Sequence, residues 1–425
     1  MQTQIFMVHK RHLGLRAPTV LAVGFALTIL VGALVLMLPV SAADGQITPF
    51  LDALFTAASA SCVTGLVTVS TAVHWSVFGK CVILLLIQIG GLGFMSVAAI
   101  ASFVLRRTIT LHERMVMSAG LNLSDGGGIV RLTRRVLFGT FIIEGTGAVL
   151  LSCRFVPHYG FPKGITMGVF HAVSAFCNAG FDLMGTPDDP FQSLIGWAED
   201  PLVNITVMAL IVLGGLGFFV WSDVWDKHSF CRLRLHTKIV LTATAGLLLF
   251  GFGWTLLFEW SNPATLGAFD TPHKLLAAAF ESVTLRTAGF NTIDLGALTG
   301  PSQAVSCLLM FIGGSPGSTA GGIKTVTAAV LVLTAISAFC GRTTVSAFGR
   351  TIAPRSIMNA VTLLMAGGVL CLVGACAIAG IEDAPFHQCL FEAVSAFGTV
   401  GVSMGLTPTL AAASRVILIV MMYMG

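Results

Sequence analysis

The sequence predicts an all-α integral membrane protein made of four pseudo-repeats, each a helix, a re-entrant pore helix and a second helix, around one central pore. Three observations support this fold class: the composition, a series of long apolar runs, and a glycine-closed segment that recurs four times. Of the 425 residues, 55% are hydrophobic and only 10% are charged, whereas soluble domains carry about 25% charged residues. This composition excludes a disordered chain, a nucleic-acid-binding protein and an ordinary cytosolic enzyme.

Long apolar runs give the expected spans. A hydrocarbon core about 30 Å thick needs roughly 20 helical residues. Seven runs come close to that length, at 18–40, 80–105, 136–153, 202–222, 239–258, 304–339 and 357–381. An eighth begins near Ala411 and reaches Gly425. The first run follows three basic residues and is too long for the core of a signal peptide, so we expect it to be the first span.

Four shorter apolar stretches separate the two runs of each pair. They cover 50–62, 166–177, 273–285 and 386–397. A stretch of about 12 residues is too short to cross the membrane and, being apolar, is not typical of a surface loop. Such a stretch predicts a re-entrant helix, which a membrane accepts only where protein or a water-filled cavity surrounds it.

A small-residue segment that closes on glycine follows each short stretch. The closing glycines, spaced about 112 residues apart, are Gly65, Gly180, Gly289 and Gly401. The string Gly-Gly-Leu-Gly-Phe also occurs twice, at 90–94 and 214–218. This self-similarity predicts a fourfold repeat. We expect pore repeats at 17–108, 131–224, 236–341 and 354–425, the last one with an incomplete final helix.

Lysine and arginine give the expected orientation. The N-terminus and the links 106–135, 227–238 and 342–355 carry 16 of the 23 basic residues. Since cytoplasmic loops are enriched in positive charge, we expect a multi-pass protein of the cell (inner) membrane with a cytoplasmic N-terminus. Fourteen of the 19 acidic residues fall on the outer side. They would concentrate cations there, although any single one could simply be a solvated loop charge.

Four such units predict a pore lined by backbone carbonyl groups. Carbonyl oxygens can replace the water shell of a monovalent cation. To point successive carbonyls at one axis, the backbone needs unusual angles, and glycine reaches positive φ without a Cβ clash. The partially negative C-terminal ends of the short helices favour a cation in the cavity below them. Glycine packing between helices is the simpler alternative, but four glycines in register argue against it.

The sequence resembles the membrane subunit of the Trk/Ktr/HKT potassium-uptake superfamily, in particular the KtrB type, over about residues 17–425. The most specific marks are Arg-Thr-Ala-Gly-Phe-Asn at 286–291 and Ile-Gly-Gly-Ser-Pro-Gly-Ser-Thr-Ala-Gly-Gly-Ile-Lys-Thr at 312–325. The resemblance implies uptake of K⁺ as the transported ion, with no enzymatic activity and no organic cofactor. It implies K⁺ binding in a selectivity filter formed by Val63, Thr64, Gly65, Asn178, Ala179, Gly180, Thr287, Ala288, Gly289, Thr399, Val400 and Gly401. Glycine rather than serine at position 65 implies preference for potassium over sodium.

A glycine-rich segment interrupts the second span of the third unit. Residues 313–322 contain five glycines and one proline, so we expect unwound backbone that lines a cavity. We interpret it, as the resemblance also implies, as a flexible loop that gates the pore below the filter. The gate residues are Gly313, Gly314, Ser315, Pro316, Gly317, Gly321, Gly322 and Lys324. A phosphate-binding loop would need glycine directly before the lysine, where Ile323 stands.

Lys324 and three further charged or titratable side chains, those of Glu144, Arg286 and His171, are expected at membrane depth. Lys324 is expected to face water or the pore, or to extend to the cytoplasmic interface. Glu144 can be paired, protonated or structural. We expect Arg286 to bond carbonyl groups or to pair with an acid such as Glu281. His171 stands near where the fourth short helix has Glu392, and an isolated histidine does not indicate a metal site.

The resemblance also implies partners. They are a cytoplasmic nucleotide-binding regulatory ring subunit, KtrA- or TrkA-like, and a second copy of the chain in a homodimer, with membrane lipid around them. The basic link 106–135 is the expected docking surface, although its charges could serve topology alone. Because the last apolar run stops at Gly425, we expect an incomplete sequence or a pore open on one flank. Two alternatives remain: a sodium-coupled secondary cation transporter, and a non-conducting degenerate homologue.

Overall fold

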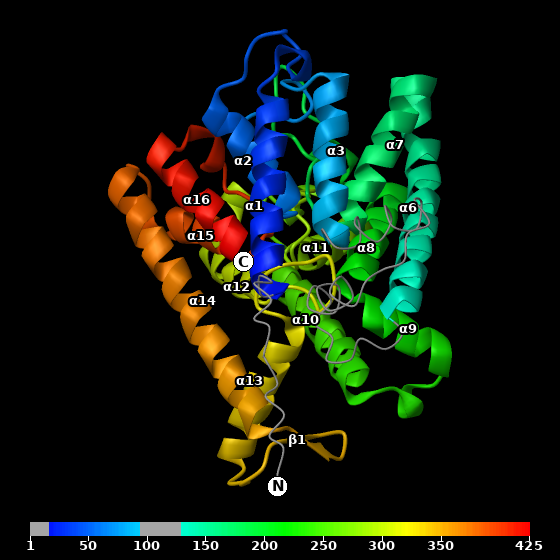
Figure 1. Cartoon of the computed structure of the whole chain (residues 1–425), viewed down its shortest axis with the longest axis vertical. Helices are drawn as coiled ribbons and strands as arrows, with labels where there is room; N and C mark the ends of the chain where they lie inside the picture. Colours follow the sequence, from blue (N-terminus) through cyan, green and yellow to red (C-terminus); the bar gives the residue numbers. More distant parts are fainter. Residues whose placement is uncertain (1–16, 94–128) are drawn as a thin grey trace, which may run out of the picture.

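The computed structural model describes residues 17–93 and 129–425, and these residues are mostly helical, with almost no strand (Figure 1). By length and composition, four helices of the described part can cross a membrane, and a bent helix pair can count as a fifth span. The four are α1 (Ala17–Leu36), α6 (Ile129–Tyr159), α10 (Leu235–Glu259) and α14 (Pro354–Ile381). The predicted all-α membrane fold is therefore confirmed.

Each long helix is followed by a short one that packs against it. The short helices are α2 (Phe50–Ser61), α7 (Phe161–Phe176), α11 (Thr271–Thr284) and α15 (Phe386–Gly398). Their second halves are almost completely buried and rich in alanine, serine and threonine. Small side chains let the helix backbones approach closely, which is how helices pack where lipid rather than water surrounds the protein.

A second helix or helix pair then follows each short helix. These are α3 (Val77–Leu92), α8 (Pro201–Gly215) with α9 (Phe218–Lys227), α12 (Gly300–Phe311) with α13 (Thr325–Phe339), and α16 (Ala412–Met424). The helix α12 ends where the glycine-rich segment begins, as the sequence predicts. The run 202–222, which we expect to be one span, is not a single straight helix, because the chain bends by 92° between α8 and α9, but the two helices together can still count as a span.

The bend has a local cause. Gly217 has a φ of 91°, a conformation that residues with a Cβ rarely adopt. The N–H of the next residue, Phe218, leaves the helical pattern and donates to the carbonyl of Gly317 at 2.9 Å. A segment about 100 residues later in the chain thus turns this helix, which periodicity within 202–222 cannot reveal.

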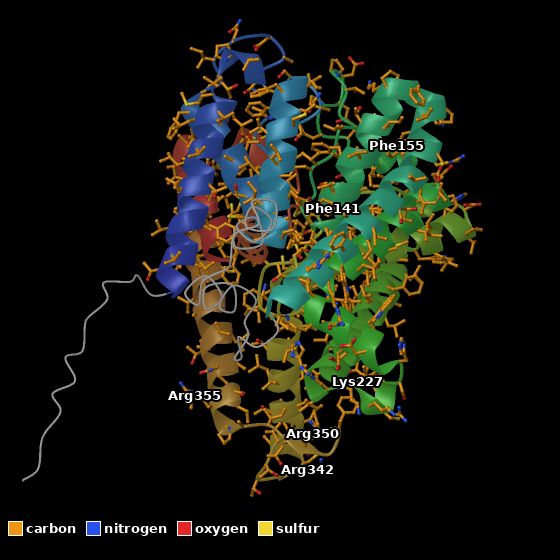
Figure 2. All side chains as sticks on the ribbon, turned by 45° about the vertical axis from the view of Figure 1, so that its right-hand side comes forward. Phe141, Phe155, Lys227, Arg342, Arg350 and Arg355 are labelled. Carbon is orange, nitrogen blue, oxygen red and sulfur yellow. The ribbon has the colours of Figure 1, made fainter. Side chains whose placement is uncertain are left out.

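Basic residues gather at one end of the molecule. Lys227, Arg342, Arg350 and Arg355 all lie toward the lower end of Figure 2. The same end holds α9 and a hairpin of two antiparallel strands, β1 (Ser346–Ala347) and β2 (Arg350–Thr351). The arrangement agrees with the charge-based orientation, although the N-terminus and most of the link 106–135 lie outside the described residues.

Helices from the two ends of the chain also meet. The last helix, α16, packs against the first short helix, α2. Arg415 joins them through Nη1, which lies 2.7 Å from Oδ1 of Asp52. The same carboxylate oxygen accepts a hydrogen bond from Thr68 Oγ1 at 2.8 Å. The helices therefore close into one assembly around the segments that follow the short helices.

Candidate cation-conduction site

The segment after each short helix has one backbone pattern. A residue with left-handed φ stands two positions before each closing glycine, and the glycine itself also has positive φ. The pairs are Val63 (56°) and Gly65 (98°), Asn178 (59°) and Gly180 (67°), Thr287 (64°) and Gly289 (84°), and Thr399 (48°) and Gly401 (90°). Left-handed backbone costs a β-branched residue, as three of these four are, of order 1–3 kcal/mol, whereas asparagine tolerates it better. Four repetitions of it indicate that the surrounding structure imposes this conformation.

The four glycines meet in a closed ring. A Cβ placed on Gly65 would lie 2.6 Å from the carbonyl oxygen of Ala179, and one on Gly180 would lie 2.9 Å from that of Ala288. The pattern continues around the ring, from Gly289 to the oxygen of Val400 at 2.9 Å and from Gly401 to the oxygen of Thr64. Each glycine thus faces the carbonyl that precedes the next glycine. Any side chain at these positions would collide with backbone of the neighbouring segment.

The ring is the floor of a cavity. All four glycines line a hollow of about 220 Å³, whose walls come from the residues after each glycine. Asp182 and Asp294 are among its lining side chains. Burial raises the pKa of Asp182 to about 6, so this carboxylate is still mostly ionised at neutral pH. A negatively charged mouth above a ring of carbonyls attracts cations.

Hydroxyl groups of the short helices hold the segments in place. Gly65 N donates to Ser59 Oγ at 3.0 Å. Ser174 Oγ donates to the carbonyl of Phe181 at 2.7 Å, and Ser395 Oγ to that of Val402 at 2.6 Å. These three serines stand six residues before their glycine. In the third unit Thr284, five residues before its glycine, donates to Phe290 in the same way. Sequence reasoning missed this brace, although the six-residue spacing shared by three of the four units could have indicated it.

His171 and Glu392 have one shared role. The Nε2 atom of His171 accepts a hydrogen bond from Leu183 N at 3.3 Å, and Oε1 of Glu392 accepts one from Met404 N at 3.2 Å. Both donors lie three residues after the closing glycine. The two side chains therefore support the outer arm of their segments. The described residues contain no group of three or more ligating side chains that could hold a metal ion.

The glycine-rich segment folds back on itself. Gly313 N donates to the carbonyl of Ile323 at 2.9 Å, and Thr325 N donates to that of Gly314 at 3.0 Å. Arg286 secures this fold, because its Nη2 donates to the carbonyl of Gly313 at 2.9 Å and to Thr325 Oγ1 at 3.0 Å. Of the two expectations for Arg286, carbonyl bonding is the one observed, and no ion pair with Glu281 is found among the described residues.

This segment lies on the side of the ring opposite the cavity. Thr319 Oγ1 donates to the carbonyl of Phe176, at the end of α7, at 3.2 Å. Gly321 is in contact with the side chain of Thr399. These contacts are with residues that precede the closing glycines, whereas the cavity is lined by residues that follow them. Lys324 is half-buried, and its Nζ donates to the carbonyl of Ala320 at 2.7 Å.

The segment also contacts the bend between α8 and α9. Ser315 N donates to the carbonyl of Gly215 at 3.0 Å, and Gly217 lies beside the carbonyl of Pro316. With the bond from Phe218 to Gly317, these contacts attach the middle of the segment to the second unit. The residues predicted as gate residues thus lie together, between the ring and the bent helix pair.

Comparison with known proteins identifies the family. The family model described as TrkH, cation transport protein, matches residues 10–425. The chain is 43% identical over 408 residues to Ktr system potassium uptake protein B of Bacillus subtilis, covering 96% of this chain and 90% of that protein. It is 41% identical over 409 residues to the potassium/sodium uptake protein NtpJ of Enterococcus hirae, covering 95% and 89%.

A solved structure shares the fold. The potassium transporter TrkH from Vibrio parahaemolyticus matches with a TM-score of 0.73 over 98% of this chain and 84% of that chain, at 17% sequence identity. The family match and the structural match both extend over nearly the whole chain. The protein is therefore a multi-pass membrane protein that belongs to the TrkH family of cation transport proteins, which are transporters and not enzymes.

Proposed function

We propose that the chain takes up K⁺ into the cell through the ring of four glycine-closed segments. The observation that carries this proposal is the closed order of contacts, in which each glycine faces the carbonyl before the next. Such a ring can present carbonyl oxygens from four directions to one dehydrated cation. The similar Bacillus subtilis protein is named as a potassium uptake protein, which supports K⁺ as the ion.

In this mechanism a cation enters the cavity and loses water at the ring. Asp182 and Asp294 raise the local cation concentration, and the carbonyls of the filter segments take the place of the water shell. The partially negative C-terminal ends of α2, α7, α11 and α15 favour the cation on the inner side. Units at 17–108, 131–224, 236–341 and 354–425 are the proposed pore repeats.

The loop 313–322 is the proposed gate. It contacts residues that precede the closing glycines and is held by Arg286 and by the α8–α9 bend, and we propose that it blocks the cation until it moves. A cytoplasmic nucleotide-binding ring subunit is the proposed regulator, and the membrane protein is proposed to be a homodimer in the cell (inner) membrane with its N-terminus in the cytoplasm. Arg134 and Arg135 belong to the proposed docking link, but Arg106, Arg107 and Arg114 lie outside the described residues.

Uptake of ⁸⁶Rb⁺, an analogue of K⁺, tests the function. Liposomes with the purified chain should take up ⁸⁶Rb⁺ down its gradient, and K⁺ should compete far better than Na⁺. Equal competition by the two ions would refute the selective filter. Absence of flux both from the folded unsubstituted chain and from folded Arg286→Met, in which the contacts that hold the proposed gate are removed, would favour a non-conducting homologue. Because NtpJ is named as a potassium/sodium uptake protein, a sodium-coupled transporter is the second candidate. It requires that a Na⁺ gradient alone drive ⁸⁶Rb⁺ uptake.

A further inference from the structure

A carboxylate is buried midway along the spanning helix α6. Glu144 lies between Phe141 and Phe155 in the sequence of this helix, on which Figure 2 labels those two residues, and it is only 5% exposed. A carboxylate at this depth is costly unless hydrogen bonds compensate for the lost water, and it usually marks a functional position. Among the described residues, no lysine or arginine forms an ion pair with it.

The partners of Glu144 come from two other helices. Gln88 of α3 donates through Nε2 to both carboxylate oxygens, at 3.3 and 3.2 Å. The thiol of Cys177, which follows the last residue of α7, lies 3.9 Å from Oε1 of Glu144 and 3.7 Å from Oε1 of Gln88. The three polar groups thus connect the second helix of the first unit with the first helix and short helix of the second unit.

This network touches the base of two filter segments. Cys177 directly precedes Asn178, the left-handed residue of the second segment. On α3, a Cβ on Gly91 would lie 2.6 Å from Cys177 Sγ, and one on Gly90 would lie 2.8 Å from the side chain of Val63 in the first segment. The helix that carries Gln88 is therefore packed against both segments with no space for adjustment. A shift of either bonded partner would be passed to the filter backbone.

We propose that Glu144 is a positioning residue for ion selectivity, which fixes the first and second filter segments relative to each other through Gln88 and Cys177. The hydrogen bonds, rather than a charge sensed by the ion, are what matters in this role. The inference rests on the proposed K⁺ filter, and it concerns how exactly two of the four carbonyl groups are placed.

Three variants test it. Glu144→Gln keeps a hydrogen-bonding amide of the same size, Glu144→Leu removes the bonds, and Gln88→Leu cuts the link to α3 while Glu144 remains. Thr140→Val is the matched control, because Thr140 lies one turn earlier on the same face of α6, is fully buried, and has a hydroxyl with no partner in the structure. The readout is the ratio of K⁺ to Na⁺ competition against ⁸⁶Rb⁺ uptake, for equal amounts of monodisperse protein.

We expect Glu144→Leu and Gln88→Leu to lower this ratio by at least about fivefold, the size of a typical coupling between sites. Glu144→Gln and Thr140→Val should stay within about twofold of the unsubstituted chain. A merely structural role would reduce the amount of folded protein and the maximal rate, but not the ratio. An unchanged ratio in Gln88→Leu would overturn the proposal even if Glu144→Leu failed to fold.

Two other outcomes separate a failure of this proposal from a failure of the proposed function. Loss of selectivity in Glu144→Gln as large as in Glu144→Leu would also overturn the proposal, because it would assign the effect to the charge. If the unsubstituted chain itself shows no preference for K⁺, the proposed function fails, independently of Glu144.

Discussion

The substitution Gly65→Ser tests the ring most directly. The glycine has a φ of 98°, and a residue with a Cβ pays of order 1–3 kcal/mol for a conformation of this kind. Its new Cβ would lie 2.6 Å from the carbonyl oxygen of Ala179, whereas ordinary contacts begin at 3.4 Å. Either the serine or the Ala179 carbonyl must therefore move by about 0.8 Å, the difference between these two distances.

This displacement determines the expected size of the effect. If the strain of about 1–3 kcal/mol falls on the K⁺-binding arrangement alone, preference for K⁺ over Na⁺ drops by about 5- to 150-fold. The assay is competition of K⁺ and Na⁺ against ⁸⁶Rb⁺ uptake in liposomes. We expect the maximal rate for Na⁺ to rise or stay constant while the affinity for K⁺ falls.

The matched control is Gly45→Ser. Gly45 also has positive φ, at 70°, but nothing lies within 4 Å of the position where its Cβ would be. The control therefore shares the conformational strain and lacks the collision with a carbonyl. Selectivity that is unchanged in Gly65→Ser, or equally reduced in both variants, would refute the argument that Gly65 faces the second filter segment.

Three further predictions concern the gate, the mouth and the closure of the assembly. Arg286→Met removes charged hydrogen bonds to Gly313 and Thr325, worth about 1.5–3 kcal/mol, so basal ⁸⁶Rb⁺ flux without any regulator should rise about tenfold or more. Arg286→Lys, which keeps a positive charge and a hydrogen-bond donor, is the control. Equal flux through the two variants would contradict the role of Arg286. Burial raises the pKa of Asp182 to about 6, so its charge is lost as the outer pH falls from 7 to 5, and the KM for K⁺ should rise about two- to fivefold. Asp182→Asn should remove that pH dependence. If the KM of this variant still changes with pH, titration of Asp182 is not the cause. Arg415→Met breaks the contact with Asp52 and should lower the apparent melting temperature in detergent without changing selectivity. A change in selectivity would show that the contact does more than hold α16 to α2.

Residues whose role follows from their own backbone could be predicted from the sequence. The glycine at 65 and its three counterparts stand out because a glycine recurs in register in each segment, as a need for positive φ predicts, and the structure brings all four together. The break at 313–322 was predictable for the same local reason, a density of glycine that no helix tolerates. The assignment of these residues to filter and gate remains a prediction.

Roles that depend on a partner elsewhere in the chain could not be predicted. The bend at Gly217 exists because Phe218 bonds Gly317, and the chain around residue 217 contains no sign of this partner. Glu144 stayed open for the same reason, since Gln88 and Cys177 are 56 and 33 residues away. The sequence could not decide whether Arg286 bonds carbonyl groups or pairs with Glu281, because the answer depends on distances in three dimensions.

The ring of contacts consists of four unlike pieces of a single polypeptide. In an oligomeric channel of identical subunits, any mutation in the lining appears in every subunit at once. Here one of the four segments can change while the other three stay constant. The position two residues before the glycine already holds valine, asparagine, threonine and threonine in the four segments. Evolution can thus tune such a pathway in small increments, and only the glycines, each confined by its neighbour's oxygen, are denied that freedom.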